Sequence, residues 1–182
     1  MSHLTSIDLP QFGTPESLPP ISVTEYQLRL QEATARMERT GYDFLAIYGD
    51  REHSANLAYL TGFDPRFEEA LLLLDRQGNR TLLVGNECLG YLPDPALECR
   101  TVLFQDFSLL GQDRSLSPPL RNIFAEAGIG QDCTVGCVGW KYFTDATENR
   151  LEYAIEIPAY IVDLLRDICG DTTQVRNATN LF

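Results

Sequence analysis

Basic side chains are scarce in this 182-residue sequence, and Lys141 is its only lysine. The 14 basic residues are scattered along the chain and face 26 acidic ones, so the formal net charge is −12 at pH 7. Phosphate backbones and anionic lipid headgroups are bound by clustered basic side chains. The composition therefore argues against nucleic acid, and against a membrane surface, as a partner.

Long hydrophobic runs are absent as well. No apolar stretch approaches the roughly 20 residues that a membrane-spanning helix needs, and the N-terminus lacks the basic and apolar segments of a signal peptide. We therefore expect a cytoplasmic protein. The cysteines are odd in number and lie in apolar segments, which predicts reduced, mostly buried thiols. They are Cys88, Cys99, Cys133, Cys137 and Cys169.

Residue types for the commonest catalytic and metal sites are few. Histidine occurs only at positions 3 and 53, so a zinc site with two histidine ligands has no plausible pair. Cys133 and Cys137 are four positions apart in an expected strand, a spacing that we interpret as structural. The sequence has no Walker or Rossmann glycine loop and no Gly-x-Ser-x-Gly elbow, and a cysteine nucleophile would depend on His53 for activation.

Ordered structure is expected to begin at Ser22. Residues 1–21 hold several prolines and no periodic pattern, which predicts an extended N-terminal arm. From Ser22, a capping box with Glu25 opens a helix whose apolar residues recur at helical spacing, and Gly41 ends it.

Five segments have the apolar character of strands. The loop "RQGN" joins two of them, and its Gly78 and Asn79 favour an antiparallel hairpin. The unbroken apolar run of the first segment suits a central strand that is covered on both faces. The expected strands are residues 43–48, 70–75, 80–85, 100–105 and 133–138.

Two further helices complete the pattern. Ser117 can cap the first, which the following Pro118 starts and Gly128 stops, and the second runs from about Pro158 to Gly170. Strands and helices alternate around one hairpin. This order predicts a three-layer α/β domain with a mixed, mostly parallel sheet, of the ribonuclease H-like kind.

The densest group of charged side chains follows the first expected strand. Asp50, Glu52 and His53 stand just after the carboxyl end of that strand, the usual place for function in an α/β sheet. An acidic pair with one histidine could bind a divalent cation, as in a small nuclease or phosphatase, although the acidic surface makes nucleic acid a poor substrate. A solvated loop, or caps for a following helix, is the structural alternative.

The order of elements from Ser22 onward resembles the N-terminal domain of the creatinase, prolidase and Xaa-Pro aminopeptidase family. The residues that carry the resemblance are "TGYDFLAIYGD", "NLAYLTGF" and "ALLLLDRQGNRTLLV". The match is good over about residues 22–84 and continues by element order alone to about Gly170. The resemblance implies a domain over residues 22–172. The final residues, 173–182, are expected as a short strand or as a linker towards an absent C-terminal catalytic domain.

In this family the catalytic domain has a pita-bread fold, in which two aspartates, a histidine and two glutamates hold two divalent metal ions such as Mn²⁺. None of these motifs occurs here, so the resemblance implies no catalytic residue and no metal ligand in this chain. We expect a truncated or stand-alone accessory domain that is inactive alone. Its parent would be a metal-dependent Xaa-Pro peptidase or creatinase-like hydrolase, acting on small peptides or creatine-like substrates. The domain would shape the cleft and pack the subunits of a homo-oligomer.

Four residues are candidates for substrate binding. In some relatives the loop after Tyr-Leu-Thr-Gly reaches a neighbouring subunit's cleft, and by this resemblance Phe63 and Arg66 would contact the substrate. His53 and Asn56 lie in the charged loop before that motif. Asn56 has the alternative role of a hydrogen bond to nearby backbone.

Alternatives remain open for Arg66 and for the chain as a whole. Arg66 could bind a substrate carboxylate through both ends of its guanidinium, or could pair with Asp64, Glu68 or Glu69. The competing function is a stand-alone ligand-binding or regulatory module that uses the loop over residues 50–56.

Aromatic side chains outside this loop allow two interpretations. We expect Tyr59 and Leu60 to lie in the core. Trp140, Tyr142 and Phe143 form either a packing cluster or an exposed interface patch, because aromatic residues are enriched at contacts between proteins.

Overall fold

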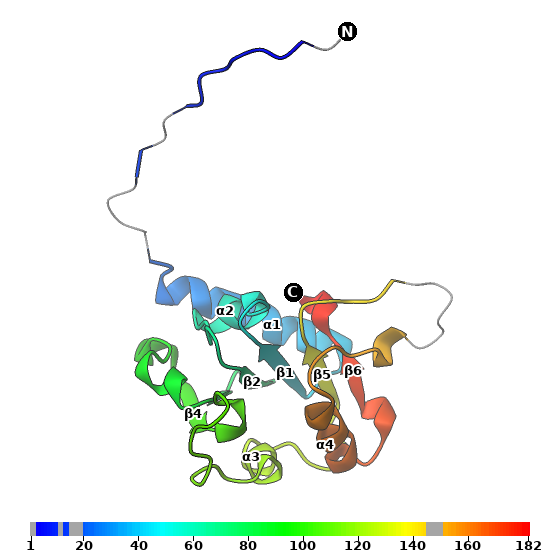
Figure 1. The fold of residues 1–182 in the computed structure, drawn as a ribbon. Helices are drawn as coiled ribbons and strands as arrows, with labels where there is room; N and C mark the ends of the chain where they lie inside the picture. The colour runs from blue at the N-terminus through cyan, green and yellow to red at the C-terminus, as the bar shows by residue number, and fades with distance from the viewer. Residues whose placement is uncertain (1–2, 11–12, 15–19, 145–150) are drawn as a thin grey trace.

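The computed structural model of the chain describes residues 3–10, 13–14, 20–144 and 151–182. The described residues of the N-terminal arm, 3–10 and 13–14, stand away from the body of the protein (Figure 1). Residues 3–10 have neither helix nor strand, and their side chains are exposed.

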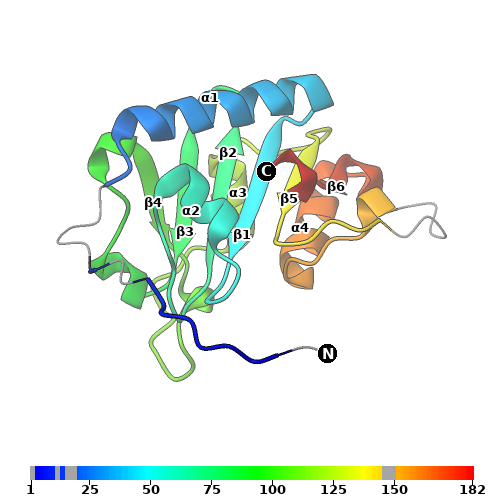
Figure 2. The same cartoon turned by 90° about the horizontal axis from the view of Figure 1, so that it is seen from above.

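The first helix, α1 (Val23–Thr40), is built as its sequence predicts. The Ser22 hydroxyl accepts a hydrogen bond from the backbone N–H of Glu25 at 3.2 Å. Gly41 ends the helix in the left-handed conformation, at φ 81°, which glycine adopts without steric cost. Ala33 and Met37 are buried against the sheet, which the helix crosses (Figure 2).

Six strands form one mixed sheet in the order β4-β3-β2-β1-β5-β6. β2 alone runs against the others, because it pairs antiparallel with β1 and β3 while the other pairings are parallel. The predicted hairpin is β2–β3, and the order is that of the predicted ribonuclease H-like motif with β4 added at one edge. The strands are β1 (Phe44–Gly49), β2 (Ala70–Asp75), β3 (Arg80–Val84), β4 (Cys99–Leu103), β5 (Val135–Val138) and β6 (Val175–Asn177).

β1 is buried along its whole length and divides the core in two, as expected of a central strand. Successive side chains of a strand point to opposite faces. Leu45 and Ile47 therefore pack on the side of α1, whereas Ala46 packs on the opposite side. The register places Ala46 between Leu73 of β2 and Cys137 of β5.

Three shorter helices complete the two outer layers (Figures 1 and 2). α2 (Ala55–Thr61) lies beside α1, and α3 (Leu120–Glu126) and α4 (Ala159–Cys169) cover the other face. After the first strand the sequence leaves open a solvated loop or a following helix, because seven residues are too few to show a helical period, and the structure has the helix α2 there. None of the helices in the described ranges is long and apolar enough to cross a membrane.

Ser117 does not cap α3, contrary to expectation. Its hydroxyl accepts a hydrogen bond from the backbone N–H of Gln105 at 2.9 Å, and Pro119 holds the N-cap position. Ser117 thus ties the approach to α3 to the segment after β4. Pro118 precedes the helix and does not start it.

Tyr59 is not a core residue, although its neighbour Leu60 is fully buried. The Tyr59 side chain is 38% exposed, lies under the Arg29 guanidinium at 4.7 Å, and meets Phe182 edge to face at 5.9 Å. An amphipathic phenol suits this place between α1, α2 and the surface.

The last ten residues pack with the domain. β6 extends the sheet beyond β5, and the flanking turns are η5 (Thr172–Gln174) and η6 (Thr179–Leu181). Val175 and Ala178 have no exposed surface. Residues 173–182 are therefore a strand and turns of this domain and not a linker, because their apolar side chains close the core beside β5.

Candidate functional site

The carboxyl ends of five strands lie at one edge of the sheet, because only β2 is reversed. The segments after β1 and β5 leave from this edge, and the segment before β2 arrives there. Loop residues 50–53, Trp140 and the pair Glu68 and Glu69 therefore come together. Open α/β sheets bind ligands at this edge.

Asp50 organises the turn after β1. One of its oxygens, Oδ1, accepts hydrogen bonds from the backbone N–H groups of Glu52 at 2.9 Å and His53 at 2.8 Å. The same oxygen lies 3.1 Å from Nδ1 of the His53 ring. Partial burial alone would raise the pKa of Asp50, but these hydrogen bonds outweigh burial and lower it.

His53 and Asn56 fasten this turn to the segment after β5. The His53 ring stacks on Trp140, with ring centroids 4.4 Å apart and an angle of 18° between the planes. Asn56 donates a hydrogen bond from Nδ2 to the carbonyl of Gly139 at 2.6 Å. Asn56 therefore bonds backbone, as its alternative role required, but backbone that is distant in the sequence.

The turn opens on a shallow acidic hollow of about 340 Å³, which we call the edge pocket. Tyr48 on its wall donates a hydrogen bond to Glu69 Oε2 at 2.7 Å. Burial raises the pKa of Tyr48, and the Glu69 carboxylate adds to that rise. The lining residues are Tyr48, Asp50, Arg51, Glu52, His53, Phe67, Glu68 and Glu69.

Glu68 is only 3% exposed, although it carries a carboxylate. Its Oε2 accepts a hydrogen bond from the backbone N–H of Cys88 at 3.1 Å, and its Oε1 has no partner among the described residues. Burial raises the pKa of the Cys88 thiol to about 11, and Glu68 contributes to the rise. Cys88 is therefore a structural thiol and no candidate nucleophile.

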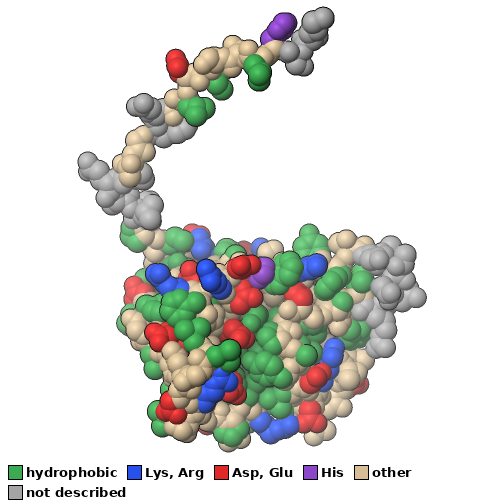
Figure 3. All heavy atoms as spheres, in the orientation of Figure 1, with side chains coloured by type: hydrophobic (Ala, Val, Ile, Leu, Met, Phe, Trp, Pro, Cys, Tyr) green, Lys and Arg blue, Asp and Glu red, His purple; other side chains and the backbone are tan. Residues whose placement is uncertain are grey.

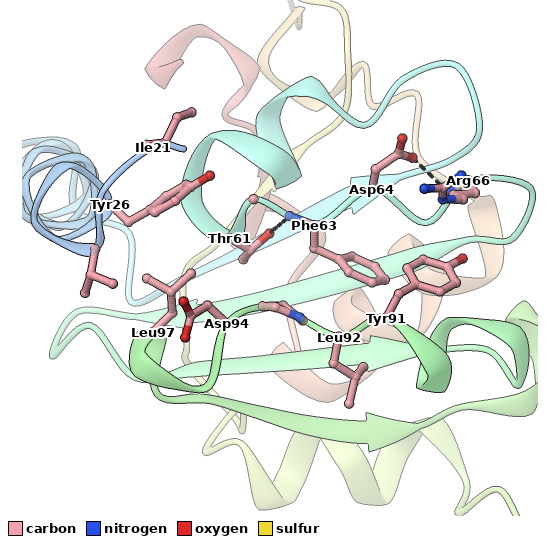
Figure 4. Close-up of a pocket in the computed structure, with 13 residues that line it drawn as sticks. Ile21, Tyr26, Thr61, Phe63, Asp64, Arg66, Tyr91, Leu92, Asp94 and Leu97 are labelled. Atoms are coloured by element: carbon pink, nitrogen blue, oxygen red, sulfur yellow. Dashed lines mark hydrogen bonds between the residues drawn. The ribbon is translucent and has the colours of Figure 1, made fainter. Parts of the chain in front are cut away.

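A second hollow, of about 350 Å³, lies between the start of α1, the end of α2 and the segment before β4 (Figure 4). We call it the aromatic pocket, because the rings of Phe63 and Tyr91 stack in it at 5.8 Å. Tyr91 donates a hydrogen bond to the carbonyl of Pro65 at 3.1 Å, which fixes the ring. Asp64 and Asp94 add carboxylates to the lining.

Arg66 lies at the rim of the aromatic pocket in an unusual backbone conformation. Its φ of 58° is in the left-handed region, and its N–H donates to Asp64 Oδ1 at 2.8 Å. The guanidinium lies over the Tyr91 ring at 5.6 Å. It takes part in none of the ion pairs that the described residues form, so it does not pair with Asp64, Glu68 or Glu69.

The four candidate substrate residues thus separate into two places. Phe63 and Arg66 line the aromatic pocket, and Phe63 is only 2% exposed, so its ring forms the floor. His53 lines the edge pocket, and Asn56 supports the turn beside it. Only Arg66 of the four has an exposed side chain.

Tyr91 was not found from the sequence, although it is the partner of both Phe63 and Arg66. It follows η1 (Glu87–Gly90), a single turn of 3-10 helix in a segment without a strand or a helical period. No local signal marks it, because its role arises from contacts with a loop that lies far away in the sequence.

Trp140 and Tyr142 are exposed by 50% and 61%, which favours the interface interpretation over a packing cluster. The backbone N–H groups of Trp140 and Lys141 both donate to Glu156 Oε1, at 2.7 and 2.6 Å. The Glu156 carboxylate therefore fixes the backbone of Trp140 and Lys141, whose side chains are exposed.

Residues that could hold a metal do not gather in the part of the chain that the structure describes: no group of three or more His, Cys, Asp or Glu side chains is suitably placed there. Asp50 and Glu52, which the nuclease or phosphatase interpretation requires, do not form such a group. The Asp50 carboxylate accepts its hydrogen bonds from its own turn.

The fold is that of a ribonuclease H-like α/β domain, with polar residues gathered at the carboxyl ends of its strands. Comparison with known families gives the particular class. The sequence profile of the Creatinase/Prolidase N-terminal domain matches residues 29–127. The chain belongs to this family.

Solved structures of this class have the same fold. Dipeptidase PepE from Mycobacterium ulcerans superposes with a TM-score of 0.56 at 19% identity, over 90% of this chain and 37% of that one. A prolidase from Pyrococcus horikoshii OT3 gives 0.51 at 10% identity, over 85% and 33%. An Xaa-Pro aminopeptidase from Streptococcus pyogenes gives 0.52 at 14% identity, over 88% and 96%. At these identities the likeness establishes the fold alone.

This chain spans roughly a third of the dipeptidase and of the prolidase, at 37% and 33% of their lengths. A search among curated proteins gives no match.

Proposed function

We propose that the chain is the noncatalytic N-terminal domain of a cytoplasmic, metal-dependent Xaa-Pro aminopeptidase, prolidase or creatinase-like hydrolase. In this role it contributes to oligomerisation and to substrate access. Its first partner is a C-terminal catalytic domain of the same parent protein. The observation that carries the proposal is the family match over residues 29–127, together with the fraction of the dipeptidase and the prolidase that this fold occupies.

Arg66 is the residue through which we expect the domain to affect the substrate. An exposed guanidinium without an ion pair can bind the carboxylate of a small peptide through two parallel hydrogen bonds. The Tyr91 ring lies beneath this guanidinium, and the buried Phe63 stacks on Tyr91. In this proposal Phe63 positions the loop, and Arg66 reaches into a neighbouring subunit's cleft.

The exposed aromatic residues are the surface that we assign to contacts within the parent protein. Trp140 and Tyr142 are exposed, Glu156 holds the backbone of Trp140, and aromatic side chains are enriched where proteins meet. His53 stacks behind Trp140. We propose that His53 and Asn56 act on substrate access through this surface and do not themselves contact the substrate.

Two divalent metal ions, such as Mn²⁺, would supply the hydrolytic chemistry by activating water and polarising the scissile carbonyl. The side chains that the structure describes do not fit such a centre, because no cluster of suitable ligands exists among them. We therefore assign the metals to the catalytic domain. In this proposal no described residue of this chain takes part in the hydrolytic step.

The decisive experiment is an activity assay on the purified chain. It is incubated with Xaa-Pro dipeptides, a longer Xaa-Pro peptide and creatine, with and without added Mn²⁺. We expect no turnover above the buffer control. Metal-dependent hydrolysis of any of these substrates would overturn the assignment as noncatalytic. Reading the coding sequence downstream of the codon for Phe182 is the complementary test, and an Asp, Asp, His, Glu, Glu series there supports the proposal.

A stand-alone ligand-binding or regulatory module is the second candidate, and the edge pocket favours it. That pocket combines several carboxylates with Arg51, which takes part in none of the ion pairs among the described residues. Calorimetric titration with amino acids, dipeptides and divalent ions separates the two functions. Micromolar binding that is lost in Arg51→Ala would favour the module, and an accessory domain should bind weakly or not at all.

A further inference from the structure

The guanidinium of Arg66 has no ion pair, although acidic side chains are plentiful around it. The chain has 26 acidic residues against 14 basic ones, and the two kinds intermingle on the face drawn in Figure 3. Asp64, Glu68 and Glu69 all stand within three positions of Arg66. None of them pairs with its guanidinium among the described residues. The loop over residues 64–68 therefore leaves its arginine free although partners are near.

Each of these three acids is engaged by another donor of the chain. The donors are the backbone N–H of Arg66 for Asp64, the backbone N–H of Cys88 for Glu68 and the hydroxyl of Tyr48 for Glu69, at 2.8, 3.1 and 2.7 Å. A guanidinium can donate two parallel hydrogen bonds to a carboxylate. The Arg66 guanidinium keeps this capacity for an anion from outside the chain.

Glu68 also fastens the loop to the segment that carries Tyr91. Its carboxylate is buried, with Oε1 unpartnered among the described residues and Oε2 on the backbone of Cys88. A Cβ on Gly85 would lie 2.5 Å from Oε2, so the glycine leaves the space that the carboxylate occupies. Burying a carboxylate oxygen without a partner costs free energy. In native proteins such a cost calls for a reason beyond packing, and a loop held in one geometry supplies it.

Tyr91 ties down the residue that precedes Arg66. Its hydroxyl donates a hydrogen bond to the Pro65 carbonyl at 3.1 Å, and the backbone N–H of Glu68 donates to the same carbonyl at 3.1 Å. Pro65 is buried, and its ring fixes its own φ. The φ of 58° at Arg66 is uncommon for a residue other than glycine. Fixed neighbours therefore hold Arg66 in a conformation that an arginine rarely adopts.

The Tyr91 ring also supports the side chain of Arg66. The guanidinium carbon lies 5.6 Å from the ring centroid, within the range of about 6 Å for a cation–π contact. Phe63, which is buried, stacks on the same ring (Figure 4). A ring that is packed on a buried neighbour and bonded through its hydroxyl is a fixed platform for the guanidinium.

We propose that Tyr91 is a positioning residue for Arg66: its ring supports the guanidinium and its hydroxyl fixes the loop, so that Arg66 meets the carboxylate of a small peptide unpaired and oriented. The inference rests on the proposed role of Arg66 in binding a substrate carboxylate, and it adds the residue that orients this group. A side chain that is already held in its binding geometry loses less conformational entropy when the ligand binds. Removing the Tyr91 ring should therefore weaken binding, although Tyr91 acts only through Arg66.

NMR of the isotopically labelled full chain tests the orientation of Arg66 through the Nε–Hε resonances of its arginines. Arg66→Gln assigns the Arg66 signal by its disappearance. We expect the Tyr91 ring to shift the Arg66 Hε upfield, and Nε to be more ordered than that of Arg51, an exposed arginine that also takes part in none of the ion pairs among the described residues. Tyr91→Leu should remove both effects. Tyr91→Phe keeps the ring and should retain the upfield shift.

Titration with N-acetylproline measures the consequence for binding. This probe has a carboxylate and no ammonium group, and N-acetylprolinamide is the control that lacks the carboxylate. We expect the Arg66 signal to respond to the acid alone. Its dissociation constant should rise about threefold or more in Tyr91→Leu and stay within about twofold of the native value in Tyr91→Phe. Tyr59→Leu is the matched variant, because Tyr59 lies under the Arg29 guanidinium at 4.7 Å, and it should leave the affinity of Arg66 unchanged.

Three results would overturn the proposal. The first is an Arg66 side chain as mobile as that of Arg51 in the native chain, and this comparison decides the matter even if Tyr91→Leu does not fold. The second is unchanged order and affinity of Arg66 in a folded Tyr91→Leu variant, which removes the role of Tyr91 and leaves that of Arg66 standing. The third is a native Arg66 signal that N-acetylproline does not move. The assignment of the chain as noncatalytic is decided separately, by hydrolysis in the activity assay.

Discussion

Arg80 is a cation in an unusual place, since it is only 8% exposed and takes part in none of the ion pairs among the described residues. Its guanidinium donates to the carbonyls of Leu60 and Leu97, where α2 and η2 (Pro95–Leu97) end. One residue of β3 therefore fastens two helix ends, which would otherwise have unsatisfied backbone carbonyls. Its Nε has no partner among the described residues.

We predict that Arg80→Met lowers the free energy of unfolding by about 1–3 kcal/mol, because methionine fills the space but leaves both carbonyls without a donor. Urea unfolding measures the change. Arg100→Met is the control, since Arg100 makes an exposed pair with Glu126 and should cost less than about 1 kcal/mol. If Arg80→Met is at least as stable as the native chain, the cost of desolvating the Arg80 guanidinium outweighs the gain from its hydrogen bonds.

The turn after β1 predicts that the stability contributed by Asp50 depends on pH. The pKa of Asp50 is lowered in the folded chain from its ordinary value of 3.8 by the N–H groups and ring that surround it. A lowered pKa stabilises the fold above the unfolded value, and this contribution disappears as the pH falls through the folded value. We expect Asp50→Asn to be less stable than the native chain at pH 7, with the difference closing below about pH 3.8. Urea unfolding from neutral to acidic pH measures it, and a difference that stays constant would contradict the assignment.

Strand β5 requires a glycine at position 136, because neighbouring side chains leave no room for a Cβ. A Cβ at Gly136 would lie 2.6 Å from the Ala178 Cβ and 2.7 Å from Leu45 Cδ2. The close approach lets the segment after β6 pack directly on β5.

Gly136→Ala should therefore destabilise the chain by about 1–3 kcal/mol through overpacking. Gly130→Ala is the matched control, because a Cβ there meets nothing within 4 Å and its φ is not positive. It should change the midpoint of thermal unfolding by much less. Equal effects of the two substitutions would mean that loss of glycine flexibility, and not the contact with Ala178, sets the cost.

Most elements could be predicted from the sequence because their signals are local. The caps of α1 and the glycines that end α1 and α4 appear where the sequence places them. The hairpin β2–β3 has Gly78 in its turn at φ 87°. The antiparallel pairing of β1 with β2 follows from the predicted ribonuclease H-like motif and not from the residues of the two strands, because an apolar strand carries no label for its neighbour.

The site was less predictable than the fold, for the same reason. The sequence places Asp50, Glu52 and His53 after a central strand, and this position is confirmed. It could not pair His53 with Trp140, or Phe63 with Tyr91, because these contacts join residues brought together only by the finished sheet.

The buried side chains of the C-terminal segment, residues 173–182, predict that the domain extends to the end of the described chain. Val175 and Ala178 are fully buried and Leu181 is 9% exposed. Deleting residues 173–182 should therefore lower the free energy of unfolding by more than about 3 kcal/mol, since each buried aliphatic side chain contributes about 1.5–3 kcal/mol.

Deleting residues 1–20 is the contrasting experiment. The described part of that arm is exposed, so the unfolding free energy of the monomer should change by less than about 0.5 kcal/mol. Urea unfolding at low protein concentration compares the two deletions. Equal losses would mean that the arm belongs to the fold as much as β6 does.

The reversed strand β2 has a consequence for synthesis on the ribosome. β1, β2 and β3 follow one another in the chain and can pair as soon as they emerge, but the other edge of β1 waits for β5 (Val135–Val138). At about 5–20 residues per second this wait is roughly 4–17 s. Throughout it the nascent polypeptide presents an apolar, unpaired edge to its surroundings, which is the state in which chaperone capture competes with aggregation.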